Sequence, residues 1–293
     1  MTESHAPHGT NGSTAPATPI PSLDVRQQLE GARLLILGGT GFLGKIFWVM
    51  MLARYPSVGR IYLLVRKGKT KTSIERFWSE IATSECLEPL RTLHGDGFKA
   101  FLESKIMPVD GDVGLENCGI DSPLLKELKG TIDAVINVAG VVDFNPPLDE
   151  ALDTNAFGAQ NLVALSRSLG DAPLMHTSTC YVVGNRKGLI IEEKPGERFP
   201  FPRAEELGRD LWDPKREIDD CLDLIAQARS RVEDAFRQSE FMERATKNLT
   251  RRGEPTIGTP LAQELKAVKR KYVSDRLVEA GLERATHWGW PNI

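Results

Sequence analysis

The glycine-rich segment GGTGFLG, residues 38–44, is the part of the sequence whose residue types and spacing most clearly indicate chemistry. Its three spaced glycines permit a tight turn and let a pyrophosphate approach the backbone closely. A helix that begins after such a turn presents unpaired N–H groups and partial positive charge to the phosphates. We therefore expect a dinucleotide site here. The residues expected to contact the ligand are Gly38, Thr40, Gly41, Phe42, Leu43 and Gly44.

A basic pair follows the second apolar run, IYLLV at 61–65. Arg66 lies 22 residues after Gly44, close to the offset at which NAD-binding domains place an Asp or Glu for the ribose 2′-hydroxyl. A guanidinium at this position suits a 2′-phosphate instead, because it forms charge-assisted hydrogen bonds with phosphate oxygens. Arg66, with Lys67 or Lys69, therefore favours NADP(H) over NAD. The alternative is an exposed basic loop without a ligand.

Two further positions follow the third and fourth apolar runs. Asp112 comes after the third run, where its carboxylate would meet the edge of the adenine, and Val113 would lie against the adenine ring. Ala139 and Gly140 come after the fourth run and offer small residues beside the cofactor. Parallel strands end at the same edge of a sheet, so these residues are expected near the glycine turn.

The elements that must position these residues are read from hydrophobic patterning. The expected strands are 33–37, 61–65, 105–109, 134–138 and 174–177. Between them we expect helices over 45–53 and 154–169 and a largely helical region over 71–104. Continuous apolar strands separated by helices indicate a parallel sheet covered on both faces. The predicted fold class is α/β, with a doubly wound (Rossmann) parallel sheet that is incomplete at its C-terminal side.

Composition divides the chain into three segments. Residues 1–22 are rich in Pro, Thr, Ser, Ala and Gly and are expected to be disordered, because they bury too little apolar surface to offset their ordering entropy. Residues 23–195 form the expected Rossmann core. Residues 196–293 carry a charged helical insertion after the fifth strand, interpreted as a solvated hairpin with one apolar stripe. Within it, Gly281 fits a helix C-terminal cap.

Composition also excludes several classes of function. The 293-residue chain has a net charge of −3, which argues against a nucleic-acid-binding surface. Its four cysteines and five histidines form neither CxxC nor HExxH, which argues against a metal site. Unpaired cysteines and the lack of an apolar N-terminal segment favour a reducing, cytoplasmic setting.

The sequence gives little sign of membrane insertion. No apolar stretch approaches the ~20 residues that span a bilayer. The basic stretch KAVKRK at 266–271 could touch anionic lipid or coenzyme A phosphates, but a solvated helix face explains it equally.

Several of these segments together resemble the fatty acyl-CoA reductase, or male sterility, branch of the extended short-chain dehydrogenase/reductase superfamily, which is related to thioester-reductase domains. They cover about 32–293 and are GGTGFLG (38–44), LLVRKG (63–68), NVAG (137–140), NAFG (155–158), HTSTCY (176–181), IEE (191–193) and GWPN (289–292). The resemblance implies NADPH-dependent reduction of a long-chain acyl-CoA thioester to an aldehyde or alcohol. It also implies that a Ser or Thr hydroxyl and a Tyr hydroxyl hold the substrate carbonyl oxygen. In such enzymes the Tyr is the general acid, and a Lys four residues later lowers its pKa.

By this resemblance Thr179 supplies the hydroxyl, and Ser178 is its neighbour to test second. The alternative for both is an ordinary polar strand end. Asn155 would help to order the site through backbone contacts or water, or it is an ordinary residue near a helix N-terminus.

The Tyr-x-x-x-Lys pair of such enzymes is not in this sequence, because none of the tyrosines at positions 55, 62, 181 and 272 has a lysine four residues later. In the family that helix follows directly after Gly-Trp-Pro-Asn, so we interpret the chain as a reductase truncated just before it. Alone it is expected to bind NADPH weakly or not at all and to reduce little, since general-acid assistance is worth ~10²–10⁴-fold.

Two alternatives stay open: an NADP(H)-binding pseudo-enzyme module, and a reductase of carrier-protein thioesters. A reductase of nucleotide sugars is disfavoured by the long stretch 196–285, because sugar-nucleotide enzymes reach their Tyr much sooner after the fifth strand.

Overall fold

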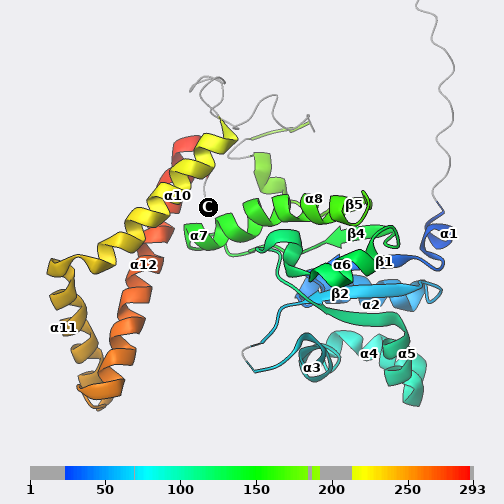
Figure 1. The fold of residues 1–293 in the computed structure, drawn as a ribbon, viewed down its shortest axis with the longest axis horizontal. Helices are drawn as coiled ribbons and strands as arrows, with labels where there is room; N and C mark the ends of the chain where they lie inside the picture. The colour runs from blue at the N-terminus through cyan, green and yellow to red at the C-terminus, as the bar shows by residue number, and fades with distance from the viewer. Residues whose placement is uncertain (1–23, 69, 184–186, 192–212, 291–293) are drawn as a thin grey trace, which may run out of the picture.

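The computed structural model describes residues 24–68, 70–183, 187–191 and 213–290. Lys69, the expected tail and the first part of the expected insertion lie outside the described residues. Within them, a five-stranded parallel sheet has the order β3-β2-β1-β4-β5 (Figure 1). The strands are β1 (Arg33–Leu37), β2 (Arg60–Val65), β3 (Ile106–Asp110), β4 (Ala134–Asn137) and β5 (Leu174–His176). The five expected strands are therefore confirmed, each within two residues at its ends, and the sheet is of the doubly wound Rossmann type.

The strands are continuously apolar because both faces of the sheet are covered. In β1, Leu34 and Ile36 belong to one hydrophobic cluster, whereas Leu35 and Leu37 belong to the cluster on the opposite face. All four side chains are at most 2% exposed, which leaves no polar face for a solvated sheet.

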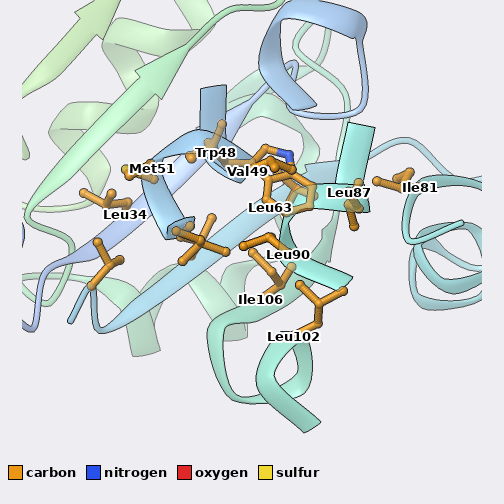
Figure 2. Packing of buried hydrophobic residues seen from close by; sticks show 14 of the residues in the cluster. Leu34, Trp48, Val49, Met51, Leu63, Ile81, Leu87, Leu90, Leu102 and Ile106 are labelled. Carbon is orange, nitrogen blue, oxygen red and sulfur yellow. The ribbon is translucent and has the colours of Figure 1, made fainter. Parts of the chain in front are cut away.

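Short helices from the segment between β1 and β3 cover the first face. Trp48, Val49 and Leu52 of α2 (Phe42–Arg54) pack there with residues from the region after β2 (Figure 2). The elements of that region are α3 (Ser73–Arg76), η1 (Phe77–Ile81), η2 (Glu85–Leu87), α4 (Glu88–His94), η3 (Gly95–Gly97) and α5 (Phe98–Lys105). The expected largely helical region over 71–104 is thus confirmed.

The second face is covered by helices from the other half of the core. Leu128 and Leu162 pack against β1 and β4 in the second cluster. The elements on this side are η4 (Glu116–Gly119), α6 (Ser122–Leu128) and α8 (Gly158–Ser168), and α8 continues from α7 (Leu148–Ala151) and η5 (Leu152–Phe157). The expected helix over 154–169 therefore begins earlier, at Leu148, after the stiff pair Pro146-Pro147. The short helix α1 (Val25–Leu29) precedes the sheet.

Three longer helices follow the core in the described part of the chain: α10 (Pro214–Ser230), α11 (Ala235–Arg252) and α12 (Gly258–Trp288), with η8 (Arg231–Glu233) between the first two. The helices α11 and α12 form the expected hairpin, which extends away from the sheet (Figure 1). The expectation that Gly281 caps a helix is wrong. Gly281 is buried inside α12, and the helix ends at Trp288 before Gly289, whose φ of +87° suits a C-terminal cap.

The helical arm is attached to the core through α7. Leu148 and Leu152 form one buried cluster with Ile225 of α10 and Leu277 of α12. Arg284 of α12 then ties the two long helices together, because its Nε and Nη2 each lie 2.6 Å from a carboxylate oxygen of Glu217 on α10. The fork-to-carboxylate geometry makes this a specific contact rather than a loose surface pair.

Candidate functional site

The glycine turn lies where the strand order of the sheet reverses. The chain passes from β1 to β2 on one side and returns to β4 on the other, and ligands of open α/β sheets bind at this position. Gly38, the first residue after β1, has φ +77°. A Cβ on Gly38 would lie 2.3 Å from the backbone nitrogen of Ala139 and 2.5 Å from the carbonyl carbon of Val138, just after β4. Glycine is therefore required for the turn to pack against the exit of β4.

Helix α2 begins directly at the end of this turn. Its first residue is Phe42, three residues before the expected start, and Gly41 is the N-cap. Phe42 and Leu43 are exposed, whereas a Cβ on Gly44 would lie 2.3 Å from the carbonyl oxygen of Gly38. The three spaced glycines thus bring the first turn of α2 against the end of β1, as a phosphate site at a helix N-terminus requires.

Trp48 of α2 stabilises the glycine turn through a hydrogen bond, and no sequence pattern pointed to this residue. Its indole Nε1 donates a hydrogen bond to the carbonyl oxygen of Gly39 at 2.9 Å. The Trp48 side chain is fully buried among the residues of the first hydrophobic cluster (Figure 2). Trp48 and Gly39 are nine residues apart, and this spacing matches no known sequence motif. A buried tryptophan in the second turn of α2 was the available signal, because a buried indole N–H needs an acceptor.

We expect Trp48→Phe to weaken the turn and the fold together. The substitution leaves the buried carbonyl of Gly39 without its donor, which costs about 1–3 kcal/mol, and the smaller ring adds a cavity. Urea unfolding followed by circular dichroism measures the loss. Trp78→Phe is the matched control, because Trp78 is half-buried and packs edge-on against Phe77. Equal losses in the two variants would contradict a special role for the Trp48 hydrogen bond.

The basic pair after β2 lies beside two carboxylates. Arg66 Nε is 3.6 Å from Asp112 Oδ2, and Lys67 Nζ is 3.0 Å from Asp110 Oδ2. Both cationic side chains are about two-thirds exposed, at 64% and 66%. Ion pairs this exposed contribute roughly 0–1 kcal/mol to stability. A doubly charged phosphate could therefore take the place of the carboxylates beside Arg66 and Lys67 at a small cost in free energy.

Asp110 anchors this corner of the sheet. Its Oδ1 accepts a hydrogen bond from the backbone N–H of Ser73 at 3.3 Å, while Oδ2 faces Lys67. Partial burial raises the pKa of the Asp110 carboxyl, but the contacts with Ser73 and Lys67 outweigh it, so the pKa is lowered overall. The carboxylate is therefore charged at neutral pH. Arg76 fixes the same loop by donating to the backbone carbonyl of Arg66.

Hydrogen bonds within the loop after β3 fix its conformation. Asp112 Oδ1 accepts from the backbone N–H of Gly114 at 3.0 Å, and the Asp112 N–H donates to the carbonyl of Cys118. Val113 is only 5% exposed and belongs to the second core cluster. The structure thus brings Asp112 to Arg66, while most of the Val113 side chain packs inward. Adenine contacts for these two residues stay a prediction.

Asn137, the last residue of β4, shapes the segment that faces the glycine turn. Its side chain is 1% exposed; Oδ1 accepts from the Ala139 N–H and Nδ2 donates to the Ala139 carbonyl, each at 3.2 Å. The same Nδ2 lies 3.0 Å from Nδ1 of His176 on β5. Asn137 therefore couples the ends of β4 and β5. In the sequence, Asn137 stands out only as the first residue of NVAG.

Asn155 fastens the next part of this loop. Its Oδ1 accepts from the Val141 N–H at 3.0 Å, and its Nδ2 faces the Val141 carbonyl at 3.5 Å. A Cβ on Gly140 would lie 3.5 Å from the same Oδ1. Asn155 thus makes the backbone contacts that one of the two interpretations requires, and it lies inside η5 rather than at a helix start.

Thr179 and Ser178 follow β5 on the same edge of the sheet. Thr179 Oγ1 accepts a hydrogen bond from the backbone N–H of Tyr181 at 3.2 Å, and both hydroxyl residues are exposed. Because this contact uses one oxygen lone pair, the Thr179 hydroxyl can still donate its proton to a ligand. The backbone N–H of Thr177 donates to the Asn137 carbonyl, which continues the β4–β5 pairing up to this point.

The arrangement thus brings together the ends of β1, β4 and β5, with the basic pair and Asp112 at the ends of β2 and β3. No group of three His, Cys, Asp or Glu side chains could hold a metal ion within the described ranges. Burial raises the pKa of the Cys118 thiol to about 12 and that of Cys221 to about 11, so neither is a thiolate at neutral pH.

The fold and the glycine turn together define a Rossmann domain that binds a nicotinamide dinucleotide, the class found in oxidoreductases. A family model described as "Male sterility protein" matches residues 36–255, more than half of the chain. The chain belongs to this family.

Curated relatives carry the name fatty acyl-CoA reductase. Fatty acyl-CoA reductase 1 of Arabidopsis thaliana is 34% identical over 205 residues, which are 67% of this chain and 42% of the relative. Alcohol-forming fatty acyl-CoA reductase of Simmondsia chinensis is 28% identical over 267 residues, 90% of this chain and 46% of the relative. The chain thus spans less than half the length of these relatives.

One solved structure of similar fold is the terminal R domain from the myxalamid PKS-NRPS biosynthetic pathway. It is 29% identical with a TM-score of 0.45, over 56% of this chain and 39% of that chain. A further relative, fatty acyl-CoA reductase 2 of Arabidopsis thaliana, is named chloroplastic and is 32% identical over 222 residues, 74% of this chain and 36% of the relative. The cytoplasmic setting therefore stays a prediction. Among the described helices, none is both long and apolar enough to cross a bilayer.

Proposed function

We propose that this chain is the NADP(H)-binding part of a reductase that acts on long-chain acyl-CoA thioesters. The observation that carries the proposal is the convergence of the glycine turn, the basic pair and the Thr179 hydroxyl at the carboxyl edge of one parallel sheet. The names of the curated relatives support the substrate class.

The residues present fit the proposed cofactor at its adenosine end. The first turn of α2 would hold the pyrophosphate, and Arg66 with Lys67 would hold the 2′-phosphate. A Cβ on Gly41 would meet only the carbonyl oxygen of Gly38, at 3.4 Å, so the backbone at this residue leaves room for a ligand. When bound, NADPH supplies a hydride to the thioester carbon.

The chain's own contribution to the chemistry is carbonyl binding. In the proposed arrangement the Thr179 hydroxyl donates a hydrogen bond to the substrate carbonyl oxygen and stabilises the negative charge that develops on it. Ser178 is the neighbouring hydroxyl that would share this task. Since none of the four tyrosines has a lysine four residues later, the proposal assigns no proton donor to this chain.

The cofactor half of the proposal is tested with adenosine bisphosphates, because they need neither the nicotinamide ribose nor a Tyr-Lys pair. We expect 2′,5′-ADP to bind about ten to a hundred times more tightly than 5′-AMP, which lacks only the 2′-phosphate, since hydrogen bonds to a charged group contribute about 1.5–3 kcal/mol. Isothermal titration calorimetry of the chain measures both affinities. 3′,5′-ADP is the matched ligand, with the same charge and a displaced phosphate. Equal affinity for the two bisphosphates would contradict NADP(H) recognition.

A further inference from the structure

An exposed apolar patch lies beside Thr179 and belongs to neither hydrophobic cluster of the sheet. It consists of Val142 and Phe144 from the loop after β4, and Tyr181 and Val182 from the segment after β5, and is called the edge patch below. These side chains are 91%, 53%, 49% and 50% exposed. The rings of Phe144 and Tyr181 meet edge-on, with centroids 5.4 Å apart. The two loops therefore meet through this pair of rings.

The edge patch is held in place by polar contacts beneath it. Asn155 fixes the Val141 backbone at the start of the first loop, and the Asn145 N–H donates to Asp143 Oδ1 at 3.0 Å around Phe144. In the second segment, the Tyr181 N–H donates to Thr179 Oγ1 at 3.2 Å. Exposed apolar groups that are fixed in this way are typical of a surface that binds an apolar ligand.

The position of Thr179 indicates which ligand this is. Its hydroxyl is hydrogen-bonded to the backbone of Tyr181, so a carbonyl oxygen held by Thr179 places its neighbouring atoms beside the edge patch. On the sulfur side of the carbonyl, the pantetheine arm of coenzyme A carries amide groups, which need hydrogen-bond partners when they are buried. The acyl chain on the other side has no polar group, so it is the side that suits the apolar side chains of the edge patch.

We propose that the edge patch binds the first methylene groups of the acyl chain, with Phe144 as the residue that sets the preference for longer chains. This inference rests on the proposed function, because it takes the acyl thioester as the substrate. Each methylene group buried against apolar side chains strengthens binding about fourfold. Truncation of Phe144 then weakens long-chain ligands selectively and leaves short ones unaffected.

The test compares octanoyl-CoA with acetyl-CoA by isothermal titration calorimetry on the chain and its variants. We expect octanoyl-CoA to bind more tightly than acetyl-CoA to the unmodified chain. In Phe144→Ala this ratio should fall about 15-fold, the equivalent of two methylene contacts, while the acetyl-CoA affinity stays the same. Phe144→Leu should retain most of the ratio, because leucine keeps an apolar side chain at the position. Phe236→Ala is the matched control, an exposed phenylalanine on α11 at 75% exposure.

Three outcomes would overturn the inference. In the first, the unmodified chain prefers octanoyl-CoA, but the ratio of octanoyl-CoA to acetyl-CoA affinity is the same in Phe144→Ala. That result refutes acyl-chain binding by the edge patch and leaves the proposed function intact. If Phe144→Ala changes the oligomeric state in analytical ultracentrifugation and leaves the affinity ratio unchanged, the edge patch is a contact between copies of the chain. If the unmodified chain binds 2′,5′-ADP but no acyl-CoA of either length, the acyl-CoA part of the proposed function fails as well.

Discussion

Replacing Gly38 with alanine is expected to lower the free energy of unfolding by about 2–5 kcal/mol and to abolish binding of 2′,5′-ADP. The left-handed backbone at φ +77° costs an alanine about 1–2 kcal/mol. The new methyl group would also lie 2.3 Å from the backbone nitrogen of Ala139, and overpacking of this kind costs about 1–3 kcal/mol. Relief of the clash requires the ends of β1 and β4 to separate, which is the place where the dinucleotide is proposed to bind. Urea unfolding and calorimetry measure the two effects.

Alanine substitutions at two other glycines distinguish the effect of backbone strain from the effect of close packing. Gly253 has φ +68° at the end of α11, with no atom within 4 Å of a Cβ, so Gly253→Ala should cost only the backbone strain. Gly41 is in an ordinary conformation, at φ −73°, and its nearest neighbour would be 3.4 Å away. Gly41→Ala should therefore fold normally and weaken 2′,5′-ADP binding alone. If Gly38→Ala cost no more than Gly253→Ala, close packing against β4 would not explain the glycine.

The sequence was most informative for strands that are buried on both faces of the sheet. The run RLLIL predicts β1 because four consecutive apolar residues alternate between two covered faces, and the structure assigns them to two different clusters. The glycine turn was equally predictable, since its spacing requires a strand before it and a helix after it. Both features are local along the chain, so no long-range contact was needed to predict them.

The features that the sequence did not predict depend on pairs that are distant along the chain or share no pattern. The hydrogen bond from Trp48 to Gly39 and the contacts of Asn137 with Ala139 and His176 are of this kind. Gly281 was misjudged because glycine is a poor helix former by about 1 kcal/mol. Packing of α12 against α10 and α7 overrides that local preference.

The carboxylates beside the basic pair were also unexpected as partners. The adenine contact expected for Asp112 stays a prediction, whereas its Oδ2 lies 3.6 Å from Nε of Arg66. Asp110 was not singled out, although it faces Lys67 at 3.0 Å. The pairing of β2 with β3 sets Val65 opposite Asp110, so the acidic residues meet the basic ones across the strand ends. That register could not be derived from the sequence of either strand alone.

Reversing the charge of Arg66 is expected to weaken 2′,5′-ADP binding about 100-fold and to leave 5′-AMP binding nearly unchanged. Arg66→Glu removes a charge-assisted contact worth about 1.5–3 kcal/mol and places a second carboxylate next to Asp112. The folded state should lose little stability, because the exposed Arg66–Asp112 pair contributes at most about 1 kcal/mol. Calorimetric titrations at low and high salt measure the effect, which should shrink at high salt as the charges are screened.

Arg60→Glu provides the matched control for this result. Arg60 begins β2 and Arg66 follows its end, so the two reversals change the net charge equally at opposite ends of one strand. A general loss of positive charge would weaken 2′,5′-ADP similarly in both variants, whereas a 2′-phosphate site responds only to Arg66. Equal loss of 5′-AMP and 2′,5′-ADP binding in Arg66→Glu would show that the guanidinium supports the nucleotide as a whole. Unchanged binding of both nucleotides would leave the basic pair as an exposed loop and would remove the reason for preferring NADP(H) over NAD.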